Sequence, residues 1–335
     1  MKNIVIALLL LTTIGYSQSI ERQVIGSAGT TLTDGATASI DFTVGELVVS
    51  TITDGTTTLT QGFHQGEIQL AINLSAVAFL QGAALSPNTG EESLMRDDLR
   101  VSGDVPTTSP YTDAITCVAT VLNTGGTSGT GDMTDDIVDW VFVELRDETT
   151  NTTVLYSQSA LLQRDGDIVG VDGTSALSFT AASGNYHVAI KHRNHLGIMS
   201  ASTIALSATT TEVNFTNSTS QITYGSNAQT SFGMTAGLVG MWAGDVNGDS
   251  IIQYTGATPD SPSILSNALN DAGNFLNLPT YVVTGYNVND VDMNGDAQYT
   301  GSSPDTPYIL QNTLSHSGNF LNLSTYSILE QIPQQ

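Results

Sequence analysis

The chain has 335 residues, of which 32 are acidic and 8 are basic, and its formal net charge is -24 at pH 7. This excess of negative charge excludes attachment to nucleic acid or to anionic lipid by charge attraction. Cys117 is the only cysteine in the sequence, so no intramolecular disulfide can form, and the length is typical of two or three domains.

The N-terminal residues 1–17 predict a signal peptide. Lys2 precedes an apolar run from Ile4 to Ile14, and small residues lead to an expected cleavage after Ser17. The run is too short to span a bilayer, and no later segment of the sequence approaches the roughly 18 apolar residues of a membrane helix. We therefore expect an exported protein that is secreted, at the cell surface or periplasmic, without an integral membrane segment after cleavage.

Residues 18–67 predict a β-meander. Apolar and polar residues alternate in short stretches such as Ile40 to Val44, and Asp-Gly pairs stand at 34–35 and 54–55. Alternation punctuated by Asp-Gly is typical of β-hairpins. Because about 50 residues seldom form a stable core alone, we expect the meander to pack on the domain that follows.

Residues 68–218 predict a β-sandwich, and residues 219–239, rich in Ser, Asn, Thr and Gly, predict a linker. The sandwich region is rich in Thr, Ser and Val and lacks the 3.6-residue period of an amphipathic helix. Trp140 lies among valines and is expected in the core. The candidate strands are Leu70–Leu80, Ile115–Leu122, Val138–Leu145, Thr153–Ser159, Asn185–Lys191 and Thr203–Leu206. The expected fold class is mainly β.

Residues 240–335 contain an internal repeat and predict a small C-terminal module. Residues 263–269 correspond to 308–314, and 273–281 correspond to 318–326, each with an offset of 45 residues. A Ser-Pro pair precedes a helical face in the first repeat. That face consists of Ile264, Leu265, Ala268 and Leu269. Each repeat is therefore expected to be a loop followed by a helix, and two repeats can bury their apolar faces against each other.

An aspartate loop precedes each predicted helix. The first reads Asp245-Val-Asn247-Gly-Asp249, and the second reads Asp292-Met-Asn294-Gly-Asp296, 47 residues later. Oxygen side chains at alternate positions around a glycine suit a hard cation, because the loop can curl and direct each oxygen inward. The sequence therefore predicts calcium as the ligand, and chelation is expected to melt residues 240–335 and to leave the sandwich intact.

In a helix-loop-helix calcium site the ligands come from positions 1, 3, 5, 7, 9 and 12, with a backbone carbonyl at position 7. Counted in this way, the expected first-loop ligands are Asp245, Asn247, Asp249, the carbonyl of Ile251, Gln253 and a displaced Asp260 at position 16. The expected second-loop ligands are Asp292, Asn294, Asp296, the carbonyl of Gln298, Thr300 and a displaced Asp305 at position 14. Both loops are stretched relative to the standard pattern.

These units resemble the loop-helix repeats of dockerins and of thrombospondin-type calcium repeats, over about 95 residues. The resemblance rests on Asp-x-Asn-x-Asp and on the Ile-Leu helix that follows. It implies calcium ligation by the residues just named, and for a dockerin it also implies a partner protein that contacts the helices.

A wider resemblance covers most of the chain after the signal peptide. The motifs are Thr43-Val-Gly-Glu46, Leu59-Thr-Gln-Gly-Phe63, Asp139-Trp-Val-Phe-Val-Glu-Leu-Arg146, Leu162-Gln-Arg-Asp-Gly-Asp167 and His192-Arg-Asn-His-Leu196. They are similar to exported β-rich surface proteins of gliding-type Gram-negative bacteria, some of them haemagglutinin-like. This resemblance implies a surface or secreted role without defining a reaction.

The leading hypothesis is a non-enzymatic calcium-binding protein for adhesion or assembly at the cell surface, with a surface protein or a glycan as partner. A carbohydrate-binding module protein that takes part in polysaccharide use is one alternative. Trp242, before the first loop, is a candidate for an exposed platform on which a sugar stacks. A secreted hydrolase is another, suggested by the many acids, although the sequence has no nucleophile-elbow, zinc-protease or phosphate-loop motif.

Two further clusters have open interpretations. His192 and His195, with His187 nearby, are either zinc ligands or a structural corner in which the imidazoles and Arg193 bond to carbonyls or acids. Three aspartates, each in or beside an Asp-Gly pair, are either a third calcium site or turn residues. They are Asp165, Asp167 and Asp172.

Overall fold

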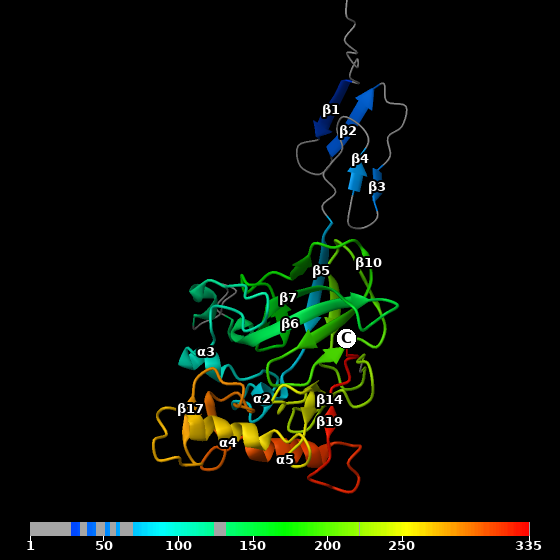
Figure 1. Cartoon of the computed structure of the whole chain (residues 1–335). Helices are drawn as coiled ribbons and strands as arrows, with labels where there is room; N and C mark the ends of the chain where they lie inside the picture. Colours follow the sequence, from blue (N-terminus) through cyan, green and yellow to red (C-terminus); the bar gives the residue numbers. More distant parts are fainter. Residues whose placement is uncertain are drawn as a thin grey trace, which may run out of the picture. The chain divides into compact units, whose positions relative to one another are not determined.

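The computed structural model describes residues 28–33, 39–44, 51–53, 58–60, 70–123, 132–220 and 222–334 (Figure 1). The predicted signal peptide lies outside these residues, as do the Asp-Gly pairs at 34–35 and 54–55. The chain divides into two compact units, Met1–Gln69 and Leu70–Gln335. No helix in the described part of the chain is long and apolar enough to cross a membrane.

The first unit contains the predicted hairpin strands. β1 (Ala28–Thr33) pairs antiparallel with β2 (Ser39–Val44), and β3 (Thr51–Thr53) pairs antiparallel with β4 (Thr58–Thr60). Alternating, threonine-rich segments thus form local antiparallel pairs, as the sequence predicts. The packing of this meander on the following domain stays a prediction.

The second unit is built on one large sheet. Its strands are β5 (Ile72–Val77), β6 (Ile137–Asp147), β7 (Val154–Gln163), β8 (Asp167–Val169), β9 (Leu177–Phe179), β10 (Gly184–Lys191), β11 (Ile198–Met199), β12 (Ile204–Leu206) and β13 (Thr211–Asn214). The hydrogen-bonded order of the described strands is β11-β10-β6-β7-β8-β5-β13, with β12 on β10 and β9 on β5. The pair β13 and β5 is parallel, and the other pairs are antiparallel.

This sheet curls so that strands near its two opposite edges come into contact. β12 pairs with β10 and also contacts β5, and Asn73 N in β5 donates to Ser207 O, just after β12, at 2.9 Å. The strands expected to form two layers of a sandwich thus belong to one curved hydrogen-bonded path. The mainly β class is confirmed.

Side chains enclosed by the sheet form the larger apolar core. Trp140 is fully buried in β6 and donates from Nε1 to Pro106 O at 2.8 Å, so its predicted place in the core is confirmed. Ile72, Leu74 and Leu161 are also fully buried. A buried indole needs a partner for its N–H, and the carbonyl of Pro106 supplies one.

The predicted strand Ile115–Leu122 is wrong in its second half. Residues Ala119–Leu122 form the 3-10 helix η1, and within Ile115–Leu122 only Thr116 makes a β-bridge, to Thr108. The other short elements before the repeats are α2 (Gln81–Ala84), α3 (Asp98–Ser102) and η2 (Met133–Asp135). A run of Ile, Thr, Val and Leu has high strand propensity, but this one has no sheet edge to pair with along its length.

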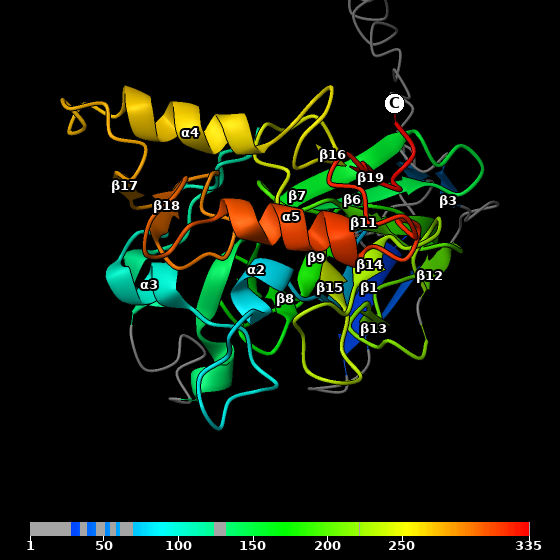
Figure 2. The same ribbon diagram turned by 90° about the horizontal axis from the view of Figure 1, so that it is seen from below.

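The predicted repeat helices are confirmed. They are α4 (Ser261–Asn270) and α5 (Thr306–Ser315), each with Pro in its first turn. Both lie at one end of the second unit, at the bottom of Figure 1 and facing the viewer in Figure 2. Ile264 and Ile309 are fully buried in one shared apolar cluster, which also takes Leu196 from the sheet region. The helices therefore pack on each other's repeat and on the sheet region.

The two repeats complete each other. β16 (Ile251–Ile252), in the first aspartate loop, pairs with β19 (Ile328–Leu329), which follows α5. β18 (Asp296–Gln298), in the second loop, pairs with β17 (Val282–Thr284), which follows α4. Each loop strand is thus paired with a strand from the other repeat.

The segment expected as a linker carries ordered structure. β14 (Gln229–Thr230) pairs with β15 (Gly240–Met241), and bridges join Ser200 to Thr223 and Asn217 to Leu238. The residues expected as sandwich, linker and module lie together in the compact unit that begins at Leu70. Contacts therefore cross both expected boundaries, and the division into separate domains stays a prediction.

Candidate metal centre

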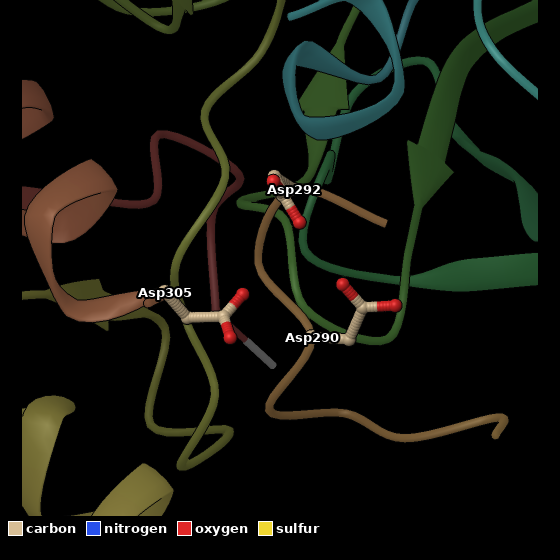
Figure 3. Close-up of side chains that lie close together, drawn as sticks. All are labelled: Asp290, Asp292 and Asp305. Atoms are coloured by element: carbon tan, nitrogen blue, oxygen red, sulfur yellow. The ribbon is translucent and has the colours of Figure 1, made fainter. Parts of the chain in front are cut away.

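Three buried carboxyl groups converge beside α5. Asp290, Asp292 and Asp305 each offer an oxygen atom, and these atoms all lie within 4.8 Å of one another. The side chains are 0%, 7% and 1% exposed, respectively. Figure 3 shows the three carboxyl groups facing a common space. Among the described residues this is the only cluster of three or more His, Cys, Asp or Glu that could hold a metal ion.

Local backbone geometry builds this centre. Met293 and Gly295 have positive φ values of 57° and 90°, which curl the chain back between Asp290 and β18. The Asp290 carboxylate accepts hydrogen bonds from Asn294 N at 3.0 Å and from Gly295 N at 2.8 Å. A left-handed Met is strained, so these bonds help to hold a conformation that the chain would not adopt alone.

Asp305 closes the centre from the start of α5. Its carboxylate does not cap the helix but accepts from Val291 N at 2.6 Å and from Gln298 N at 2.8 Å. The same residue therefore ties the beginning and the end of the loop to the helix. This explains how an acid so far along the sequence joins the cluster.

Burial disfavours the ionised form of all three carboxyl groups. It raises the pKa of Asp290 to about 7 and that of Asp305 to about 9. Burial also raises the pKa of Asp292, although the charge of Arg96 opposes this shift. Asp292 Oδ1 is buried and has no hydrogen-bond partner among the described residues. A divalent cation would favour the ionised carboxylates and occupy this unpaired oxygen.

The first repeat holds an equivalent set 45 residues earlier. Asp245 corresponds to Asp290, Asn247 to Asp292 and Asp260 to Asp305. The hydrogen bonds correspond as well, because Asp260 accepts from Val246 N at 3.0 Å and from Gln253 N at 2.9 Å. Burial raises the pKa of Asp245 to about 6 and that of Asp260 to about 8. The first repeat thus repeats the two buried carboxylates, whereas Asn247 is exposed and its Oδ1 accepts from Asp249 N at 2.9 Å.

The expected pairing of the two aspartate loops is two residues out of register. It equated Asp245 with Asp292, at an offset of 47, whereas the hydrogen bonds repeat at an offset of 45. Backbone conformation repeats at the same offset, with positive φ at Ser250 and Gly295. Asp290 was therefore missed, although the offset of the helices would have identified it.

The remaining predicted ligands have other surroundings. Gln253 Nε2 donates to Thr325 O at 3.0 Å, and Gln298 Nε2 donates to Thr280 O at 2.8 Å, so each amide braces the other repeat. Neither Asp249 nor Asp296 belongs to the described carboxyl cluster. A ligand role for these two, for the carbonyl of Ile251, for Asn294 and for Thr300 stays a prediction. Asp249 accepts from Ile251 N, Asn294 accepts from Asp296 N, and Thr300 is exposed.

Hydrogen bonds from side chains of the sheet region hold the backbone of the second loop in place. Asn194 Nδ2 donates to Val288 O at 3.1 Å and to Asp290 O at 2.7 Å. Arg96 Nη2 donates to Asp292 O at 2.6 Å. Polar side chains from the sheet region thus fix the backbone that carries two of the three carboxylates.

The histidines form a buried corner. His192 Nε2 lies 3.1 Å from Asp139 Oδ2, and His192 Nδ1 lies 3.0 Å from His195 Nδ1. Gly82 N donates to His195 Nε2 at 3.0 Å. Although burial opposes it, the charge of Arg193 and the bond from His192 lower the pKa of Asp139 to about 2.

This arrangement favours the structural interpretation over a zinc site, although the acid that pairs with Arg193 is Asp139 rather than Asp165 or Asp167. His187 bonds separately to Ser200 O. The aspartates of the alternative third calcium site also do not form a cluster with three ligands among the described residues. Asp172 instead accepts from Ser175 within its own turn.

Trp242 is not the exposed platform that the sequence suggested. It is 3% exposed, its Nε1 donates to Asn227 O at 2.9 Å, and its ring lies 5.4 Å from that of His316. Its apolar neighbours in the second cluster bury the ring.

Comparisons with family models, with curated proteins and with solved structures find no match for this chain. The resemblances to calcium repeats and to haemagglutinin-like surface proteins therefore remain predictions from the quoted motifs.

Proposed function

We propose that this protein is an exported, non-enzymatic calcium-binding protein that serves adhesion or assembly at the cell surface, with a surface protein or a glycan as its partner. The observation that carries the calcium proposal is the convergence of Asp290, Asp292 and Asp305 in a buried position. Three acids gathered away from water without a cation would be costly to ionise.

The donor set favours calcium over zinc. The cluster offers carboxylate oxygens, and calcium takes six to eight oxygen ligands in flexible geometry. Structural zinc sites use mainly Cys and His, and the described cluster contains neither. Asp245, Asn247 and Asp260 would provide a second calcium site with the same architecture.

The role of the cation would be stabilisation. Calcium sites in extracellular modules have dissociation constants of about 0.1 to 1 mM. At calcium concentrations about ten times the dissociation constant, one site adds roughly 1.4 kcal/mol to the free energy of unfolding. Two such sites would contribute a sizeable share of the marginal stability of a folded domain.

The external location and the adhesive role rest on sequence features. The leader-like N-terminus suggests export, and the net charge of -24 argues against nucleic acid and anionic membranes as partners. An acidic, cation-stabilised β protein suits a calcium-rich exterior. The partner itself is left to experiment.

Calorimetric titration of the full chain with calcium tests the proposal. We expect heat of binding at submillimolar to millimolar calcium, and a higher melting temperature in calcium than in EDTA. Asp305→Asn should remove the second site and reduce this increment, because Asp305 belongs to the cluster.

Asp271→Asn is the control, since this aspartate follows α4 and belongs neither to the cluster nor to the predicted ligands. It should retain most of the calcium effect. Absence of heat with the unmodified chain, or equal calcium effects in both variants and the parent, would overturn the assignment.

A further inference from the structure

A cavity of about 330 Å³ lies between β14 and the end of α5. Figures 1 and 2 show these two elements beside each other. Its size is at the lower end of the range for small-molecule sites. None of the cation-cluster residues lines it, so an argument about this cavity does not depend on the proposed calcium sites.

The walls combine amides, hydroxyls and aromatic rings. Asn227, Gln229 and Ser231 line one side, and Ser317 after α5 lines the other. Ser317 Oγ donates to Asn227 Oδ1 at 2.8 Å and thereby joins the two sides. None of the described residues that line the cavity carries a charge. This chemistry suits a neutral ligand that presents hydroxyl groups, and it offers no cation for a phosphate or a carboxylate.

Phe232 supplies an exposed apolar surface at the rim. Its side chain is 38% exposed, although the turn that carries it is firmly held. Phe232 N donates to Thr230 Oγ1 at 2.9 Å, and Gln81 Nε2 donates to Phe232 O at 3.0 Å. An aromatic ring fixed beside a polar cavity can pack against the C–H face of a sugar ring while amides and hydroxyls meet its hydroxyl groups.

Gln229 adds an unsatisfied acceptor to the same wall. The residue is 6% exposed, its Nε2 donates to Phe215 O at 2.7 Å, and its Oε1 has no hydrogen-bond partner among the described residues. Because the Nε2 bond fixes the orientation of the amide, Oε1 is the atom that lacks a donor. A buried acceptor left unpaired is unfavourable. A water that bridges Oε1 and a ligand hydroxyl would supply the donor.

We propose that this cavity binds a neutral saccharide, with Phe232 packing on the sugar ring, Asn227 and Ser231 contacting its hydroxyl groups, and a bridging water linking the ligand to Gln229 Oε1. The site differs from the exposed-tryptophan platform suggested by the sequence, because Trp242 lines the wall as a buried residue. The ligand is a mono- to oligosaccharide without acidic groups.

Calorimetry on the full chain tests the proposal, with calcium held at 1 mM so that loss of the cation does not confuse the result. The probes are neutral tetrasaccharides of glucose, xylose, mannose and galactose, with tetragalacturonate as the acidic comparison. We expect at least one neutral probe to bind and tetragalacturonate not to bind.

Phe232→Ala should weaken binding about tenfold, because it removes the aromatic surface on which the sugar ring packs. Ser231→Trp should abolish binding by filling the cavity. Phe320→Ala is the matched control, since Phe320 is 84% exposed and lies outside the cavity; it should bind as the parent does. Thermal melting checks that each variant folds.

The proposal is overturned if no neutral probe binds the parent protein, if only tetragalacturonate binds, or if folded Phe232→Ala binds as tightly as the parent. Failure of saccharide binding would leave the calcium titration unaffected, so the two proposals can be refuted separately.

Discussion

Asn247 and Asp292 occupy equivalent places in the two repeats, and they differ by one negative charge. The number of charged ligands is a main determinant of calcium affinity. Asp292 has a buried oxygen without a partner among the described residues, whereas Asn247 is exposed and its neutral Oδ1 accepts from Asp249 N at 2.9 Å. The second site should therefore bind calcium more tightly than the first.

Exchanging these two residues should exchange the affinities. We expect Asp292→Asn to weaken the second site about tenfold, and Asn247→Asp to strengthen the first site by a similar factor. Calorimetric titration of each variant and of the double variant measures both changes. Equal affinities in the parent chain, or no change on either substitution, would contradict the equivalence of the two loops.

The raised pKa values of the carboxyl groups predict how stability depends on pH. Burial lifts the pKa of Asp260 from 3.8 to about 8 and that of Asp305 to about 9. Without a cation, the folded state keeps protons that the unfolded state has released, so stability falls as pH rises toward these values. Calcium replaces the protons, and this loss should then disappear.

The increase in melting temperature on adding calcium should therefore grow from pH 6.5 to pH 9. Melting curves in EDTA and in 1 mM calcium across this range provide the measurement. The measurements stop at pH 6.5 because of His192 and His195. Burial lowers the pKa of both histidines in the folded state. Stability is therefore lost as pH falls below about 6.5, with or without calcium. A constant or shrinking increment would argue against ligation by these acids.

At the scale of elements, α2 packs against the second loop with no space for a side chain. A Cβ atom on Gly82 would lie 2.2 Å from Val291 O, between Asp290 and Asp292. Relief of such a contact requires the helix and the loop to separate. The glycine thus sets the distance between the sheet region and the metal centre.

Gly82→Ala should lower the free energy of unfolding by about 1 to 3 kcal/mol and weaken calcium binding at the second site more than at the first. Chemical denaturation and calorimetry measure the two effects. Gly90→Ala is the control, because nothing lies within 4 Å of a Cβ there; its positive φ still adds backbone strain, but calcium binding should not change. Equal weakening of both sites by Gly82→Ala would show that the contact acts only on global stability.

The same elements show what could be predicted from the sequence. The helices α4 and α5 follow from apolar periodicity and the Pro at their starts, and most of the long strands follow from composition and alternation. The register of the loops did not follow, because Asn-Gly-Asp occurs at 247–249 and again at 294–296, in places that are not equivalent. The repeated Asn-Gly-Asp sequence suggests an offset of 47 residues, whereas the helices repeat at an offset of 45 residues.

Long-range contacts were beyond prediction for a different reason. The burial of Trp242 depends on packing against His316 and Ile309, which lie far along the chain. Residues 219–239 have a linker-like composition, yet backbone pairing orders them. Composition reports local preference, and tertiary contacts override it.

At the scale of the whole molecule, the second unit has a tryptophan in each of its two larger described apolar clusters. Trp140 is in the large core, and Trp242 is in the cluster that contains Ile264 and Ile309 of the repeats. The sequence has 2 tryptophans in total. Hydrogen bonds from Asn194, Arg96 and Arg193 cross between the sheet region and the second loop. Chelation should therefore weaken both regions together, rather than melt residues 240–335 alone as the sequence suggested.

The variants Trp140→Phe and Trp242→Phe each leave one fluorescent reporter. In EDTA the fluorescence midpoint of each variant should coincide with the far-UV circular-dichroism midpoint of the same variant, and both should lie below their values in calcium, because the transition is cooperative. A lower midpoint for the Trp242 signal, with the Trp140 signal unchanged by chelation, would instead support an independently folding C-terminal module.

The pairing of β16 with β19 has a consequence for the order of assembly during synthesis. β17 and β18 are neighbours in the chain and can meet as soon as residue 298 has emerged, but Ile251 must wait for Leu329. The repeat that is made first is therefore finished last. A nascent chain cut short before its final ten residues or so would leave the earlier loop open while the later hairpin could still form.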